Sequence, residues 1–147
     1  MNDKKTGVFT VFLVNLALWL SYSLFFVVPP VQAQYEEVIQ GGEIEYHKQC
    51  AVCHGFEGRG DGIMAQDLAV KPADLTQVAI RNGGVFPFWR MYRTIDGREP
   101  VRAHGSREMP VWGRRFQGET TLAGPLQEAT VKGRIFGLIF YLRSIQK

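Results

Sequence analysis

Two cysteines and a histidine form the most chemically informative group in this chain of 147 residues. Cys50 and Cys53, the only cysteines, lie in the segment QCAVCHG directly before His54. A disulfide between them is disfavoured, because thiols one helical turn apart do not aim well at each other. A structural zinc site generally needs a second cysteine pair, which the sequence lacks. A thioredoxin-like redox site needs a βαβ setting, and the sequence shows no such pattern. The attachment of a larger group remains.

The pattern C-x-x-C-H is the specific signal of covalent haem attachment. Two thiols one helical turn apart can add to the two vinyl groups at one edge of a porphyrin. The next residue, His54, then lies under the iron and supplies an imidazole nitrogen. We therefore expect one haem c, bound through Cys50 and Cys53, with His54 as an axial ligand.

The iron also needs a ligand opposite His54, unless that position stays open. Met64 follows His54 closely and His47 belongs to the same expected helix, so neither reaches the other face easily. Met91 lies in an aromatic-rich helical stretch, which is typical of a core residue. The candidates are Met64, Met91, Met109, His47 and His104.

Met109 is the predicted sixth ligand. It lies far along the chain from His54, in the loop-like segment REMPVWG. Pro110 pushes the preceding residue toward an extended conformation, which suits the presentation of one side chain from a loop. His104 is the alternative. Histidine–methionine ligation raises the reduction potential relative to two histidines, and a filled sixth position leaves one-electron transfer rather than oxygen chemistry.

Periodicity and turn residues predict an all-α fold. An apolar stripe at Val131, Ile135, Leu138, Leu142 and Ile145 marks the clearest helix. That helix is expected at about 127–146. Another is expected at 35–54, with its main part starting near Gly42 and ending at Gly55. Shorter helices are expected at 63–70, after Asp74 as a possible N-cap, and at 85–97. Loops are expected at 55–62 and, mostly irregular, at 99–127.

An uncharged stretch at 7–28 is long enough to cross a bilayer as a helix. Pro29-Pro30 and Val31-Gln32-Ala33 also fit the end of a secretory signal cut before Gln34. Residues 1–33 are therefore a signal peptide or a membrane anchor, and 34–147 form the haem-binding domain. Both alternatives place that domain in the periplasm or on the outer face of the cytoplasmic membrane.

From Gly42 to Lys147 the chain resembles class I c-type cytochromes of the bacterial monohaem type. The matching features, in order, are GGEIEYHKQCAVCHG, a glycine-rich loop within GRGDGIMAQDLAVKPADLT, the Met-Pro segment, and a last helix ending IFYLRSIQ. The resemblance implies a small helical wrap around one haem. It also implies that Pro72 offers a carbonyl to His54 and that the first and last helices cross near Gly42, Tyr46, Gly137 and Tyr141.

The expected function is electron transfer between larger redox proteins, without an enzymatic activity or a small-molecule substrate. A haem subunit of a larger membrane oxidoreductase is the alternative if 7–28 is retained, and a gas-binding or catalytic haem protein is disfavoured. Nucleic-acid binding is not expected, because the arginines are spread out without a binding motif. Four residues could line the haem or belong to core or surface: Trp89, Tyr92, Arg93 and Trp112.

Overall fold

The computed structural model describes residue 15 and residues 31–98 and 109–147. It divides into two compact units, Met1–Gln34 and Tyr35–Lys147. Within the described residues every regular element is a helix, which confirms the all-α prediction. No helix in this part of the chain is long and apolar enough to span a membrane. The predicted span at 7–28 and the candidate ligand His104 fall outside the described residues, apart from residue 15.

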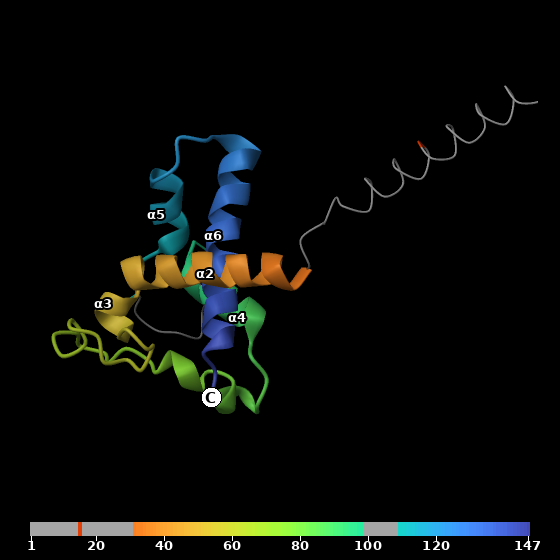
Figure 1. Cartoon of the computed structure of the whole chain (residues 1–147). Helices are drawn as coiled ribbons and strands as arrows, with labels where there is room; N and C mark the ends of the chain where they lie inside the picture. The colour runs from red at the N-terminus through yellow and green to blue at the C-terminus, as the bar shows by residue number, and fades with distance from the viewer. Residues whose placement is uncertain (1–14, 16–30, 99–108) are drawn as a thin grey trace, which may run out of the picture. The chain divides into compact units, whose positions relative to one another are not determined.

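Five α-helices and two 3-10 helices make up the described chain (Figure 1). Helices α2 and α3 precede the glycine-rich loop, and the short helices η1 and η2 follow it. Helices α4, α5 and α6 complete the fold. Their bounds are α2 Val31–Gln49, α3 Ala51–His54, η1 Leu75–Gln77, η2 Ile80–Asn82, α4 Phe88–Asp96, α5 Trp112–Gly118 and α6 Gly124–Ser144.

Helices α2 and α6 cross where two glycines face each other (Figure 1). A Cβ atom added to Gly42 would lie 1.9 Å from the carbonyl oxygen of Gly137, so the two backbones touch. Beside this contact, the buried rings of Tyr46 and Tyr141 pack with their centroids 5.2 Å apart. The crossing implied by the family resemblance is therefore confirmed at all four residues.

The core is built mainly on one face of α6. Val131, Ile135, Leu138 and Leu142 are buried as the apolar stripe predicts, and Ile145 is half-buried at its end. Side chains of α4 and α5 pack on this stripe and extend the cluster: Met91, Ile95, Trp112 and Phe116.

Arg134 ties three helices together at the edge of this core. Its guanidinium donates to Glu45 of α2 at 2.8 and 3.1 Å and to Glu119, next to α5, at 2.8 Å. The guanidinium also lies over the ring of Phe116, 3.8 Å from its centroid. Because an arginine fork can serve two carboxylates at once, this residue fixes the register of α6 against its neighbours.

Several predicted boundaries are wrong. Helix α2 begins at Val31 and continues through Gly41 and Gly42, because the contact with α6 compensates for the low helix propensity of glycine. Residues 63–70 form turns instead of a helix, since Met64 donates its N–H to Val52 of α3. Conversely, residues 99–127 were expected to be mostly irregular, but they contain α5. Its residues Trp112 and Phe116 are buried one turn apart.

Candidate functional site

Cys50, Cys53 and His54 lie on a single turn at the end of the first helical segment. The N–H of His54 donates to the carbonyl of Cys50 at 2.9 Å, which places the two cysteines one helical turn apart. Gly55 ends α3 with a φ of 83° and donates to the carbonyl of Ala51. Both cysteines are half-buried and neither forms a disulfide. The predicted disposition of two thiols directly before an imidazole is therefore present.

The environment of Cys50 keeps its thiol protonated. Burial raises the pKa of Cys50 to about 12, and the nearby charges of Glu45 and Cys53 act in the same direction. A redox nucleophile or a zinc thiolate requires the opposite environment, with a lowered pKa. In addition, no group of three or more histidine, cysteine, aspartate or glutamate residues among the described residues is arranged to hold a metal ion. The raised pKa of Cys50 agrees with the sequence argument against a redox-active dithiol.

The ring of His54 is oriented by a backbone carbonyl. Its Nδ1 lies 3.1 Å from the carbonyl oxygen of Ala73. Since a carbonyl can only accept, Nδ1 carries the proton and Nε2 presents a lone pair. Burial lowers the pKa of His54, although the bond to Ala73 partly opposes this, so the neutral imidazole is favoured. Such a ring is ready to coordinate a metal through Nε2.

The acceptor for His54 is Ala73 and not Pro72, so that prediction is wrong by one residue. The carbonyl of Pro72 faces the loop instead, where a Cβ added to Gly60 would lie 2.4 Å from its oxygen. Gly60 has a φ of 77° and donates its N–H to the carbonyl of His54 at 2.7 Å. The glycine-rich loop therefore packs against Pro72, and the next carbonyl in the chain becomes the one that reaches His54.

The segment carrying Ala73 is held from both sides. Asp74 accepts from the N–H of Thr76 at 2.9 Å and caps η1, as the sequence predicted. The N–H of Leu75 donates to Gly58 in the glycine-rich loop. Gln146, beyond the end of α6, donates to the carbonyl of Leu75 at 2.8 Å. These bonds fix the position from which Ala73 orients His54.

The four candidates for the sixth ligand among the described residues differ in burial and contacts. Met109 is half-buried and packs against the main core, as Cys50 also does. Met91 is a buried core residue of α4, in agreement with its predicted role. Met64 is 43 % exposed on the turn next to α3. His47 stacks on Phe56 with ring centroids 4.0 Å apart, so its ring is engaged elsewhere.

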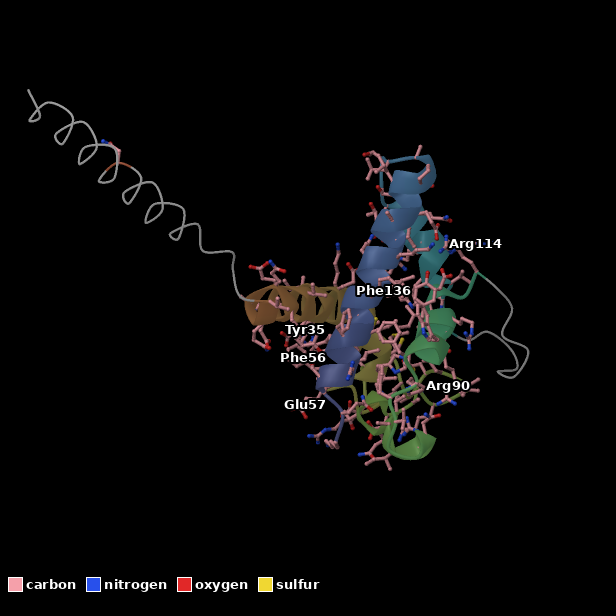
Figure 2. The ribbon with its side chains drawn as sticks, turned by 90° about the vertical axis from the view of Figure 1, so that its right-hand side faces the viewer. Tyr35, Phe56, Glu57, Arg90, Arg114 and Phe136 are labelled. Carbon is pink, nitrogen blue, oxygen red and sulfur yellow. The ribbon has the colours of Figure 1, made fainter. Side chains whose placement is uncertain are left out.

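The residues predicted to line a haem or to belong to core or surface differ in burial. Trp112 belongs to the core, whereas Trp89 is 62 % exposed and Arg93 is also exposed. Tyr92 is half-buried against Phe136, with ring centroids 5.5 Å apart. Figure 2 shows Phe136 on α6. Phe88 and Tyr92 of α4 therefore pack on aromatic rings of α6, and Trp89 meets Phe136 only from the surface.

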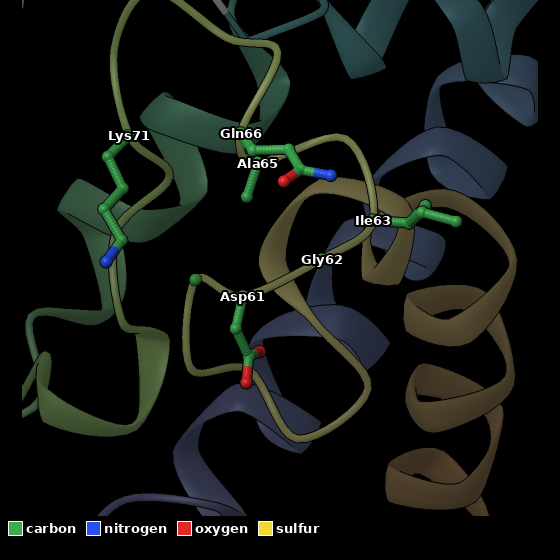
Figure 3. A pocket seen from close by; sticks show the side chains of 7 residues that line it. Asp61, Gly62, Ile63, Ala65, Gln66 and Lys71 are labelled. Carbon is green, nitrogen blue, oxygen red and sulfur yellow. The ribbon is translucent and has the colours of Figure 1, made fainter.

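An open hollow beside the turn of Cys50, Cys53 and His54 was not predicted from the sequence. It has a volume of about 500 Å³, and Asp61 and Lys71 are on its rim (Figure 3). Its remaining lining residues are Gly60, Gly62, Ile63, Ala65 and Gln66. A Cβ added to Gly62 would lie 2.5 Å from the backbone of Cys53, so the hollow adjoins the turn that carries the thiols.

The donor groups of this site fit a haem of the c type. Two free thiols one turn apart are suited to thioether formation, and a neutral imidazole with an open Nε2 is suited to iron. A half-buried thioether at Met109 adds a soft donor. Comparison of the chain with protein-family models, curated proteins and solved structures finds no match.

Proposed function

We propose that this protein is a monohaem c-type cytochrome that carries single electrons between larger redox proteins. The observation that carries the proposal is the bond from Nδ1 of His54 to Ala73, which leaves Nε2 free beside two unpaired thiols. Cys50 and Cys53 would hold the haem as thioethers, and His54 and Met109 would bind its iron. The helical arrangement, with α2 crossing α6 at Gly42, supports a class I cytochrome fold around this group.

The residues of the chain position the cofactor and tune it. When bound, the haem supplies an iron that changes its oxidation state by one electron. Ala73 holds the ring of His54 in one orientation and strengthens its ligand nitrogen. The thioether of Met109 would favour the ferrous state when it binds the iron, and it would keep oxygen and water from the metal. The protein is accordingly a carrier and not an enzyme.

Exposed apolar side chains near the turn of Cys50, Cys53 and His54 support docking of a redox partner. Val52 of α3 is exposed, and Ile63 and Met64 on the following turn are exposed as well. Such a surface suits the weak and short-lived complexes typical of electron transfer. The partners are redox proteins in the periplasm or at the outer face of the cytoplasmic membrane.

A second candidate is a membrane-anchored haem subunit of a larger oxidoreductase. The uncharged run at 7–28 favours it, because a segment of this length can be retained as an anchor. Determination of the mature N-terminus separates the two: Gln34 indicates a free carrier, and a terminus before residue 7 indicates an anchored subunit.

A pair of matched methionine variants tests the ligand assignment. Met109→Leu and Met91→Leu each replace a thioether by a side chain of similar volume, which limits the effect on packing. Both variants should retain covalently bound haem. Only Met109→Leu should lose the near-infrared absorption band that marks a methionine–iron bond in the oxidised protein. Persistence of the band in Met109→Leu would show that Met109 is not the ligand.

Covalent attachment is tested separately. Cys50→Ala and Cys53→Ala together should abolish haem staining of the denatured protein. If the double variant still stains, attachment at this motif is excluded.

A further inference from the structure

Arg98 joins the end of α4 to α6 through two carboxylates. Its Nε donates to Asp96 at 2.6 Å, and its two terminal nitrogens donate to Glu128 at 2.7 and 2.9 Å. The bidentate geometry with Glu128 is the strongest form of this pair. These hydrogen bonds also raise the pKa of Arg98 and lower that of Glu128, so both remain charged.

The same ion pair lies against the backbone that follows Met109. A Cβ added to Gly113 would lie 1.8 Å from Oδ1 of Asp96 and 2.6 Å from Nε of Arg98. A larger residue at this position would have to displace this pair, so the first turn of α5 rests directly on Arg98 and Asp96. Gly97 makes a second contact, since a Cβ there would lie 3.4 Å from Cα of Val111.

These contacts bring together two parts of the chain that flank Met109. Gly97 and Arg98 follow α4, and Val111 and Gly113 stand at the start of α5. Met109 lies two residues before Val111. Its place in the fold therefore depends on how firmly the start of α5 is held against the end of α4, and the Arg98 pairs provide that attachment.

We propose that Arg98 is a positioning residue for Met109, acting through Asp96, Glu128 and the backbone of Gly113. This inference rests on the proposed function, because it assumes that Met109 binds the iron. We call the hydrogen bonds of Arg98 to Asp96 and Glu128 the Arg98 clamp. This clamp keeps the start of α5 against the core and opposes the dissociation of the Met109 thioether from the iron. Loss of the clamp increases the fraction of molecules in which the methionine–iron bond is open.

Arg134 provides a matched control for this role. It also makes three hydrogen bonds to two carboxylates, and its side chain is 22 % exposed against 20 % for Arg98. Its partners, however, are Glu45 and Glu119, and it ties α2 to α6 and to the end of α5 rather than to its start. Removal of either arginine deletes a similar set of bonds, but only Arg98 adjoins the segment that carries Met109.

The test uses imidazole binding to the oxidised, haem-loaded full chain. Imidazole competes with Met109, so its apparent affinity rises with the fraction of molecules in which the methionine–iron bond is open. Arg98→Gln should increase this affinity by about tenfold or more, as expected when a partly buried, charged hydrogen-bond donor is lost. Glu128→Gln retains an acceptor and should give a smaller increase in the same direction. Arg134→Gln should lower the urea midpoint of helix unfolding and leave the imidazole affinity within about twofold of the wild type.

The outcomes are distinguishable. An unchanged imidazole affinity in both Arg98→Gln and Glu128→Gln, with a lowered urea midpoint, assigns Arg98 a structural role only and overturns the inference. An equal rise in affinity in Arg134→Gln also overturns it, because the effect would then follow general stability. If the wild-type protein carries haem but lacks the methionine–iron band, the ligand assignment itself fails, and the inference fails with it.

Discussion

Replacement of Gly42 by alanine is predicted to force α2 and α6 apart. The added Cβ would lie 1.9 Å from the carbonyl oxygen of Gly137 and 2.4 Å from its carbonyl carbon. Ordinary van der Waals contact begins near 3.4 Å, so the helices would have to separate by roughly 1.5 Å in an interior that packs as densely as an organic crystal. Because both partners in the clash are backbone atoms, no change of rotamer relieves it.

Gly41 supplies the reference for the size of this effect. It lies in the same helix, and a Cβ there would meet nothing within 4 Å. Gly41→Ala should therefore stabilise the domain by up to about 1 kcal/mol through helix propensity alone. Gly42→Ala gains the same helix propensity, but steric crowding against Gly137 destabilises it, typically by about 1–3 kcal/mol. The difference between the two variants isolates that cost, and the backbone contact places it at the upper end.

Urea unfolding of the haem-loaded protein, followed by far-ultraviolet circular dichroism, measures this difference. Gly42→Ala should unfold at lower urea than Gly41→Ala, and a gap of about 3 kcal/mol would lower Tm by roughly 10 °C or more. The reasoning is refuted if the two variants are equally stable. Equal stability would mean that the helices do not meet at these glycines.

Two further predictions concern the segment that orients His54. Asp74→Ala should cost about 1 kcal/mol at neutral pH through loss of the cap on η1. The hydrogen bond from Thr76 lowers the pKa of Asp74, so its contribution is complete above the ordinary value of 3.8 and is lost as the pH falls through the lower folded-state pKa. Urea titrations of wild type and variant should converge in acid, and a difference that persists there would contradict the assignment. Gly60→Ala should displace Pro72 and Ala73, because glycine alone tolerates its φ of 77° and the 2.4 Å approach. The reduction potential of haem-loaded Gly60→Ala should shift, because the hydrogen bond from His54 to Ala73 weakens. Gly83 is the control, since it has a positive φ but a Cβ there would meet no atom within 4 Å. Gly83→Ala should lower the stability of the protein without shifting the potential.

The parts of the fold that were predicted from the sequence are those governed by local rules. The apolar stripe of α6, the cap at Asp74 and the stop at Gly97 each depend on residues close together in the chain, and all three are confirmed. The boundary of α2 was wrong because Gly42 was interpreted by its low helix propensity. Its actual role is set by Gly137, far away in the sequence, and tertiary packing outweighed propensity there.

In the candidate site, too, the features set by nearby residues were predicted and those set by tertiary packing were not. The spacing of Cys50, Cys53 and His54 placed the thiols and the imidazole on one turn without any tertiary information. The choice between the carbonyls of Pro72 and Ala73 could not be made in this way, since it depends on how the glycine-rich loop packs through Gly60. The Arg98 clamp was also missed, because Glu128 belongs to a helix that the sequence does not connect with the end of α4.

The crossing of α2 and α6 joins two segments of the chain that are synthesised at different times. Glu45 and Arg134 are 89 residues apart in the sequence, and α6 is made long after the turn that carries the thiols. During synthesis, the first helix therefore forms before Tyr141, the ring that packs on Tyr46, has been made. Cys50, which packs against the core that α6 completes, is therefore more accessible until α6 is made. Contacts between distant parts of a chain form slowly, and such slowness would favour attachment of the proposed haem before the crossing forms.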